Sequence, residues 1–142
     1  MKDEGFGTVV LEAAAKLMVP FILIFALYVL FHGHYSPGGG FQGGTLGAAA
    51  VVLMRLICGD KSWGLSREAA LLLACVGVGL YAALGVGPML FGGAFLDYGA
   101  LPIPGPTAHA RALATMGVEA GIAFGVMGVM ILIFDTLSKE ES

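Results

Sequence analysis

The stretch LMVPFILIFALYVLFHGHYSPGGGFQGG, residues 17–44, joins a continuous apolar run to a glycine-rich corner. The first fifteen residues carry no charge, whereas the next thirteen contain two histidines, one proline and six glycines. An uncharged run of this kind is typical of a helix that crosses a bilayer, and proline and glycine are the residues that interrupt helices. The stretch therefore predicts a membrane-spanning helix that ends at a tight re-entrant bend.

The composition of the whole chain supports a membrane protein. Of its 142 residues, 58% are hydrophobic and 12% are charged, whereas roughly a quarter of residues are charged in a typical soluble domain. The mean hydropathy is +0.90. The formal net charge of -3 is small, which argues against nucleic-acid binding. We expect the lipid bilayer to be the solvent of most of the chain, which we take as one domain over residues 1–142.

Four segments have about the length needed to cross a hydrocarbon core of about 30 Å. They predict an all-α membrane protein with four transmembrane helices, over Ala13–Phe31, Phe41–Ile57, Ala69–Phe91 and Ala112–Phe134. The second segment is the least apolar of the four, and it contains Arg55. We expect the long side chain of Arg55 to reach the membrane surface, as arginines near helix ends commonly do.

The distribution of cations predicts the orientation. With four spans, both termini and the loop between the second and third spans lie on one side. That side receives six cations, which are Lys2, Lys16, Arg55, Lys61, Arg67 and Lys139. The other side has only Arg111. Because cytoplasmic loops are enriched in lysine and arginine, we expect a multi-pass protein of the cell membrane with both termini in the cytoplasm.

Three interpretations of the glycine-rich corner can be compared. A phosphate-binding loop requires a lysine after the last glycine, but Gly44 is followed by Thr45 and Leu46. A metal site could use His32 and His34, but no third ligand lies nearby in the sequence. A bend between two spans requires backbone angles that glycine adopts most readily. Irregular backbone at membrane depth is tolerated only against protein or water, so a bend here also predicts a neighbour.

The corner resembles the signature of the MnhB (MrpB) subunit family of multisubunit sodium/proton antiporters. The resemblance covers most of the chain, including the later segment GVEAGIAFGVMGVMILIF, residues 117–134. The residues that match the family motif are Gly33, His34, Pro37, Gly38, Gly39, Gly40, Phe41, Gln42 and Gly43.

This resemblance implies a non-catalytic subunit, without a cofactor or bound metal, that works together with other membrane subunits in exchanging Na+ for H+. Similar modules occur in membrane-bound hydrogenases and sulfur reductases, so a subunit of a redox-driven complex is an alternative. A purely structural subunit that seals the joint between larger subunits is another.

Glu119 is the most unusual residue of the fourth span. It lies roughly 10 Å below the start of that span at about 1.5 Å per residue, and no cation occupies a position three or four residues away. Carboxyl groups at such depth usually face a protein interior or a watery path. Glu119 can therefore either bind a transported proton or cation, or serve as a hydrogen-bonded structural acid.

Three glycines near Glu119, Gly117, Gly121 and Gly125, repeat at every fourth position and predict close packing against another helix. Glu119 is about 200° around the helix from this stripe, given about 3.6 residues per turn. We expect both faces to be covered, with a neighbouring subunit in contact with Glu119. The further candidates for the ion path are His34 and the Glu12/Lys16 pair, which is spaced for an i,i+4 ion pair.

Overall fold

The computed structural model describes residues 6–33, 39–58 and 65–140. Four long helices occupy these ranges, together with the short 3-10 helix η1, Tyr98–Ala100. The long helices are α1 Phe6–His32, α2 Gly40–Cys58, α3 Arg67–Leu90 and α4 Thr107–Glu140. All four are long and apolar enough to cross a membrane. The prediction of an all-helical chain with four helices able to cross a membrane is thus confirmed, and α4 extends beyond its predicted range at both ends.

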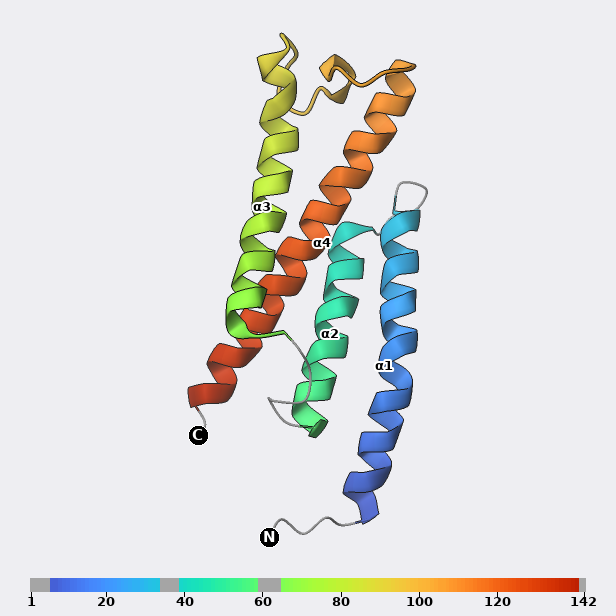
Figure 1. Ribbon diagram of the computed structural model, residues 1–142, viewed down its shortest axis with the longest axis vertical. Helices are drawn as coiled ribbons and strands as arrows, with labels where there is room; N and C mark the ends of the chain where they lie inside the picture. The colour runs from blue at the N-terminus through green and yellow to red at the C-terminus, as the bar shows by residue number, and fades with distance from the viewer. Residues whose placement is uncertain (1–5, 34–38, 59–64, 141–142) are drawn as a thin grey trace.

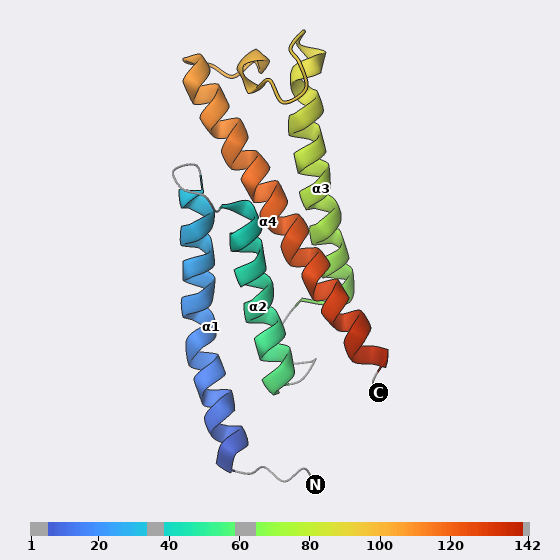
Figure 2. The same cartoon turned by 180° about the vertical axis from the view of Figure 1, so that it is seen from behind.

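Helix α4 lies at the centre of the molecule. It packs against α3 on one side and α2 on the other, while α1 packs on the far side of α2 (Figures 1 and 2). Within the described ranges, the backbones of α2 and α3 do not approach each other closely, and side chains at the start of α3 reach α2 only around Ala70. The order in space is therefore α1, α2, α4, α3, with α2 and α4 as the two inner helices.

The core is built mainly from small side chains. Ala15 and Val19 of α1 pack with Ala50 and Met54 of α2. A second cluster joins α2 to α4 and to the start of α3, and it consists of Ala48, Val51, Ala70 and Ile131. The large apolar side chains are mostly exposed, which is the reverse of a soluble protein and suits a bundle surrounded by lipid.

The hairpin of α1 and α2 and the hairpin of α3 and α4 end at different heights. The amino end of α1 and the carboxyl end of α4 both lie toward the lower edge of Figure 1, but α2 begins well below the upper ends of α3 and α4. Of the glycine-rich corner in which the bend is predicted, residues 34–38 lie outside the described residues. Its two flanks are described, because α1 ends at His32 and α2 begins at Gly40. The flanks therefore lie beside the length of α4 and below its upper end.

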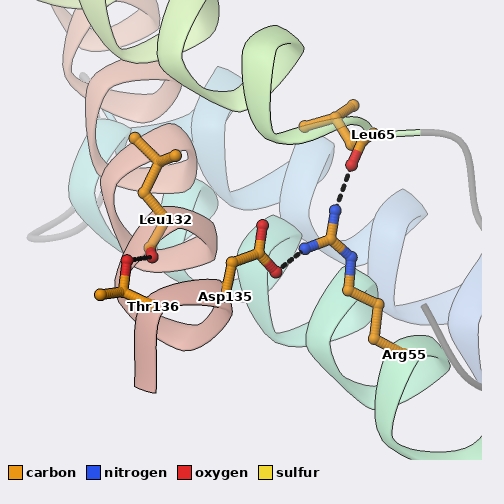
Figure 3. Close-up of polar contacts among 5 residues, drawn as sticks. All are labelled: Arg55, Leu65, Leu132, Asp135 and Thr136. Carbon is orange, nitrogen blue, oxygen red and sulfur yellow. Dashed lines mark hydrogen bonds and ion pairs between the residues drawn. The ribbon is translucent and has the colours of Figure 1, made fainter. Parts of the chain in front are cut away.

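Arg55 differs from its prediction. Instead of reaching the surface, its side chain is buried and pairs with the buried carboxylate of Asp135 on α4 (Figure 3). It also donates a hydrogen bond to the backbone carbonyl of Leu65, just before α3. Helices α2 and α4 run in the same direction. Arg55 and Asp135 each lie near the carboxyl end of their helix, so they lie at the same height in the bundle. The prediction fails because the sequence does not show that α2 and α4 are neighbours.

The Arg55 contacts connect three parts of the chain at one end of the bundle. Removing one member of a buried ion pair leaves an uncompensated buried charge, which costs about 3 to 5 kcal/mol in proteins generally. Replacing both members with apolar residues of similar volume is often neutral. The Nε atom of Arg55 is buried without a hydrogen-bond partner among the described residues.

We therefore expect Arg55→Ala to lower the free energy of unfolding by about 3 kcal/mol, measured by denaturant titration in detergent micelles. The double variant Arg55→Met/Asp135→Leu should recover most of that loss. Lys16→Ala is the matched control, because its ion pair with Glu12 is exposed and such pairs contribute only about 0.3–0.5 kcal/mol. Equal losses for Arg55→Ala and Lys16→Ala would contradict the assignment.

Candidate functional site: Glu119 at the start of α2

Glu119 lies against the two flanks of the glycine-rich connection. A methyl group on Gly33, after the end of α1, would be 2.6 Å from the Oε2 atom of Glu119. A methyl group on Gly39, just before α2, would be 3.0 Å from its carboxyl carbon. The side chain of Glu119 is half-buried. Two features that the sequence indicated separately, the motif glycines and the intramembrane carboxyl group, are therefore parts of one site.

The close approach explains why glycine occupies these positions. Gly39 has a φ of 91°, in a region that side-chain-bearing residues rarely adopt. A methyl group on Gly40 would be 2.2 Å from the backbone oxygen of Glu119, far inside the contact distance of two atoms. The backbone of α2 thus begins directly on the backbone of α4, and no larger residue fits between them.

The start of α2 also brings a helix amino terminus near the carboxyl group, and no hydrogen bond joins the two among the described residues. The amide of Gly43 donates to the carbonyl of Gly39 across 2.9 Å, which is the first turn of the helix. The amides of Gly40, Phe41 and Gln42 precede that bond and have no acceptor within the helix. A helix amino terminus also carries a partial positive charge of about 0.5. This end of α2 is therefore a favourable place for a carboxylate.

The opposite face of α4 packs against α3. A methyl group on Gly117 would be 2.8 Å from Leu84, and one on Gly121 would be 3.0 Å from the backbone oxygen of Gly77. Glu119 and the glycine stripe therefore lie on opposite faces of α4. The sequence predicts that a neighbouring subunit covers the Glu119 face, but Gly39 and Gly40 of the same chain already cover part of it.

The other candidate residues differ in what the structure describes of them. Among the motif residues, His34, Pro37 and Gly38 are outside the described residues. Phe41 and Gln42 are exposed on α2, and Gly43 packs on α1, since a methyl group there would be 3.0 Å from the backbone oxygen of Ala26.

Glu12 and Lys16 form the expected ion pair on α1. Their side chains are 41% and 58% exposed, so the pair lies on the surface of this chain. A part for them in the ion path stays a prediction.

Below Glu119, the space between α1, α2 and α4 is apolar. A cavity of about 260 Å³ lies there, and its lining includes Leu23, Leu30, Gly44 and Met127. Water is stable in a cavity only where it finds several polar partners. The cavity therefore does not continue a hydrated route from Glu119 toward the Arg55 end. Chemically, the site can hold one proton or one small cation at a carboxyl group.

We expect Gly40→Ala to disrupt the packing of α2 on α4, because the added methyl group would overlap the Glu119 carbonyl. Overpacking of a close-packed interior typically costs about 1–3 kcal/mol, measurable as a lowered unfolding midpoint in micelles. Gly79→Ala on α3 is the control, since a methyl group there meets nothing within 4 Å. A Gly40→Ala protein as stable as Gly79→Ala would disprove the contact.

The comparisons with known proteins agree with the resemblance of the motif. A family model described as a domain related to the MnhB subunit of Na+/H+ antiporter matches residues 10–132. A subunit of the Na(+)/H(+) antiporter of Bacillus subtilis (strain 168) is 33% identical over 99% of this chain and 100% of that protein. A putative antiporter subunit mnhB2 of Staphylococcus aureus (strain Newman) is 35% identical over 94% of this chain and 96% of its own length. The chain therefore belongs to the MnhB family of Na+/H+ antiporter subunits.

Proposed function

We propose that this chain serves a sodium/proton antiporter complex by holding Glu119 as a binding group for the transported ion. The observation that carries this proposal is the close approach of the Glu119 side chain to the two glycine flanks, Gly33 after the end of α1 and Gly39 just before α2. Three glycines are needed to bring those flanks so close. A carboxyl group that only had to be hidden could be covered by apolar side chains, without a helix amino terminus being placed next to it.

The position of Glu119 along α4 also suits an ion path. Glu119 is twelve residues after the start of α4 at Thr107, which is about 18 Å at about 1.5 Å per residue. The upper ends of α1 and α2 lie near this level, so above it the described residues that pack on α4 are mainly those of α3 and η1 (Figure 1). An ion could approach Glu119 from that end along a wet surface between this chain and a neighbouring subunit.

The apolar cavity below Glu119 indicates that this chain does not carry the ion alone. A charged or hydrated ion requires polar groups along its whole route. Between Glu119 and the Arg55 level, the described residues that line the cavity offer apolar side chains and small residues. We therefore assign the remainder of the path to larger neighbouring subunits of the complex, with Na+ and H+ as the exchanged ions.

The competing role is purely structural, with Glu119 as a protonated acid that only fixes the start of α2. In another alternative, the chain has the same site but belongs to a redox-driven complex. The names of the relatives refer to antiporter subunits, and they favour the antiporter setting.

The distribution of cations supports placing both termini in the cytoplasm of a cell-membrane protein. The amino end of α1 and the carboxyl end of α4 lie at the same end of the bundle (Figure 1). In that orientation Glu119 lies nearer the outer surface.

We expect Arg111→Cys to be labelled by a membrane-impermeant maleimide added to intact cells, because Arg111 would then lie on the outer side of the membrane. Labelling only after the cells are opened would contradict this orientation.

We expect Glu119→Gln to reduce sodium-driven proton exchange about tenfold or more in membrane vesicles, because the amide binds neither a proton nor a cation at neutral pH. Glu119→Asp should keep part of the activity. Native gel electrophoresis must show intact complex for both variants. Glu68→Gln is the control, since Glu68 is an exposed carboxylate in the first turn of α3. Full exchange by Glu119→Gln in intact complex would leave only the structural role.

A further inference from the structure

One face of α2 is not covered by the rest of the chain that the structure describes. Helix α1 packs on one side of α2 and α4 on another, and the backbone of α3 stays apart from α2 along the described residues. The remaining face carries Phe41, Gln42 and Ala49, which are exposed, together with the half-buried Thr45 and Leu46. We call these five residues the Gln42 face. Helix α2 is an inner helix of the bundle, and the Gln42 face is the side of it that neither α1 nor α4 covers.

The Gln42 face lies at membrane depth. Gly40, two residues earlier, packs on the backbone of Glu119. Glu119 in turn is eight residues along α4 from Arg111, or about 12 Å. In the other direction, Gln42 is thirteen residues before Arg55, or about 20 Å. The amide of Gln42 therefore lies inside a hydrocarbon core of about 30 Å, and well below the nearer surface.

An amide at this depth needs a hydrogen-bond partner. The side chain of glutamine has two donor hydrogens and an oxygen that accepts, and among the hydrogen bonds of the described residues none involves it. The neighbouring Thr45 hydroxyl is satisfied, since it donates to the carbonyl of Phe41 across 2.8 Å. Acyl chains offer neither donors nor acceptors, so lipid alone would leave the Gln42 amide unpaired in hydrocarbon.

The shape of the face suits a helix. A hollow of about 270 Å³ lies on it, lined by Phe41, Gln42, Thr45 and Leu46. Ala49, one turn beyond Thr45, is small, and small residues in membrane helices let another helix approach closely. The side chain of Phe41 is 63% exposed and stands at the edge of the hollow. The face thus combines apolar side chains, a small residue at position 49 and an amide that has no hydrogen-bond partner among the described residues.

We propose that the Gln42 face is the docking surface for a transmembrane helix of a different subunit of the antiporter complex, which brings a hydrogen-bonding side chain to the Gln42 amide. A polar group buried between helices is satisfied in this way in membrane proteins. The contact would lie close to Glu119, because Gln42 is two residues from Gly40. The neighbouring subunit would then cover the side of α4 along which we propose that the ion approaches, at the height of the Glu119 carboxyl group.

The test uses a photoreactive side chain in the intact complex in its native membrane. Position 42 or 49 is replaced by p-benzoylphenylalanine, irradiated, and the adducts are identified among the co-purifying subunits. Both positions are expected to form adducts with the same transmembrane subunit. Leu72 of α3 is the control position, since it is 67% exposed and apolar, and it should not form that adduct. Adducts from position 42 to lipid alone, or to a second copy of this chain, would overturn the proposal.

A second measurement uses a natural side chain. Gln42→Leu keeps a similar volume but removes the amide, and we expect it to lower the share of this subunit recovered with the complex about fivefold, as the loss of one interhelical hydrogen bond would. Leu72→Ala should leave recovery unchanged. Exchange activity per recovered complex tests the Glu119 proposal separately. Full recovery of Gln42→Leu, together with no subunit adduct at position 42, would refute the docking surface.

Discussion

The contact between the first residue of α2 and the backbone of Glu119 on α4 is the constraint on which the rest of the structure depends. A methyl group at Gly40 would be 2.2 Å from the Glu119 carbonyl oxygen, so the two helices meet backbone to backbone. This contact fixes where α2 begins along α4. It also sets the height of the α1–α2 hairpin relative to α3 and α4, and it holds the Glu119 carboxyl group next to the helix amino terminus.

The polar side chains at membrane depth fall into two groups. Arg55 and Asp135 are buried and paired within the chain, and Arg55 also holds the backbone carbonyl of Leu65. Glu119 and Gln42 instead remain half-buried or exposed near the start of α2. A charge that is neutralised internally serves stability, whereas a polar group left accessible in hydrocarbon needs an ion, water or another protein. This difference separates the structural end of the bundle from the end that we connect with exchange.

Much of the fold follows from the sequence, because lipid requires long apolar helices and these are visible in the residues alone. The glycine stripe at Gly117, Gly121 and Gly125 also predicts close packing against another helix, and the helical period places Glu119 on the opposite face. The sequence does not show, however, which helix packs against each of these faces. The sequence predicts Arg55 at the surface, because no local pattern shows that the helix carrying Asp135 is its neighbour. The coverage of Glu119 by Gly39 and Gly40 depends on the height of one hairpin relative to the other, which local patterns do not encode.

An experimental structure of the assembled complex tests the central claim most directly. The predicted result is density for the first turn of α2 in contact with the backbone of α4 at Glu119, with the carboxyl group directed toward Gly33 and Gly39 and away from lipid. Density that places the start of α2 at the membrane surface, with Glu119 facing acyl chains, would contradict the account.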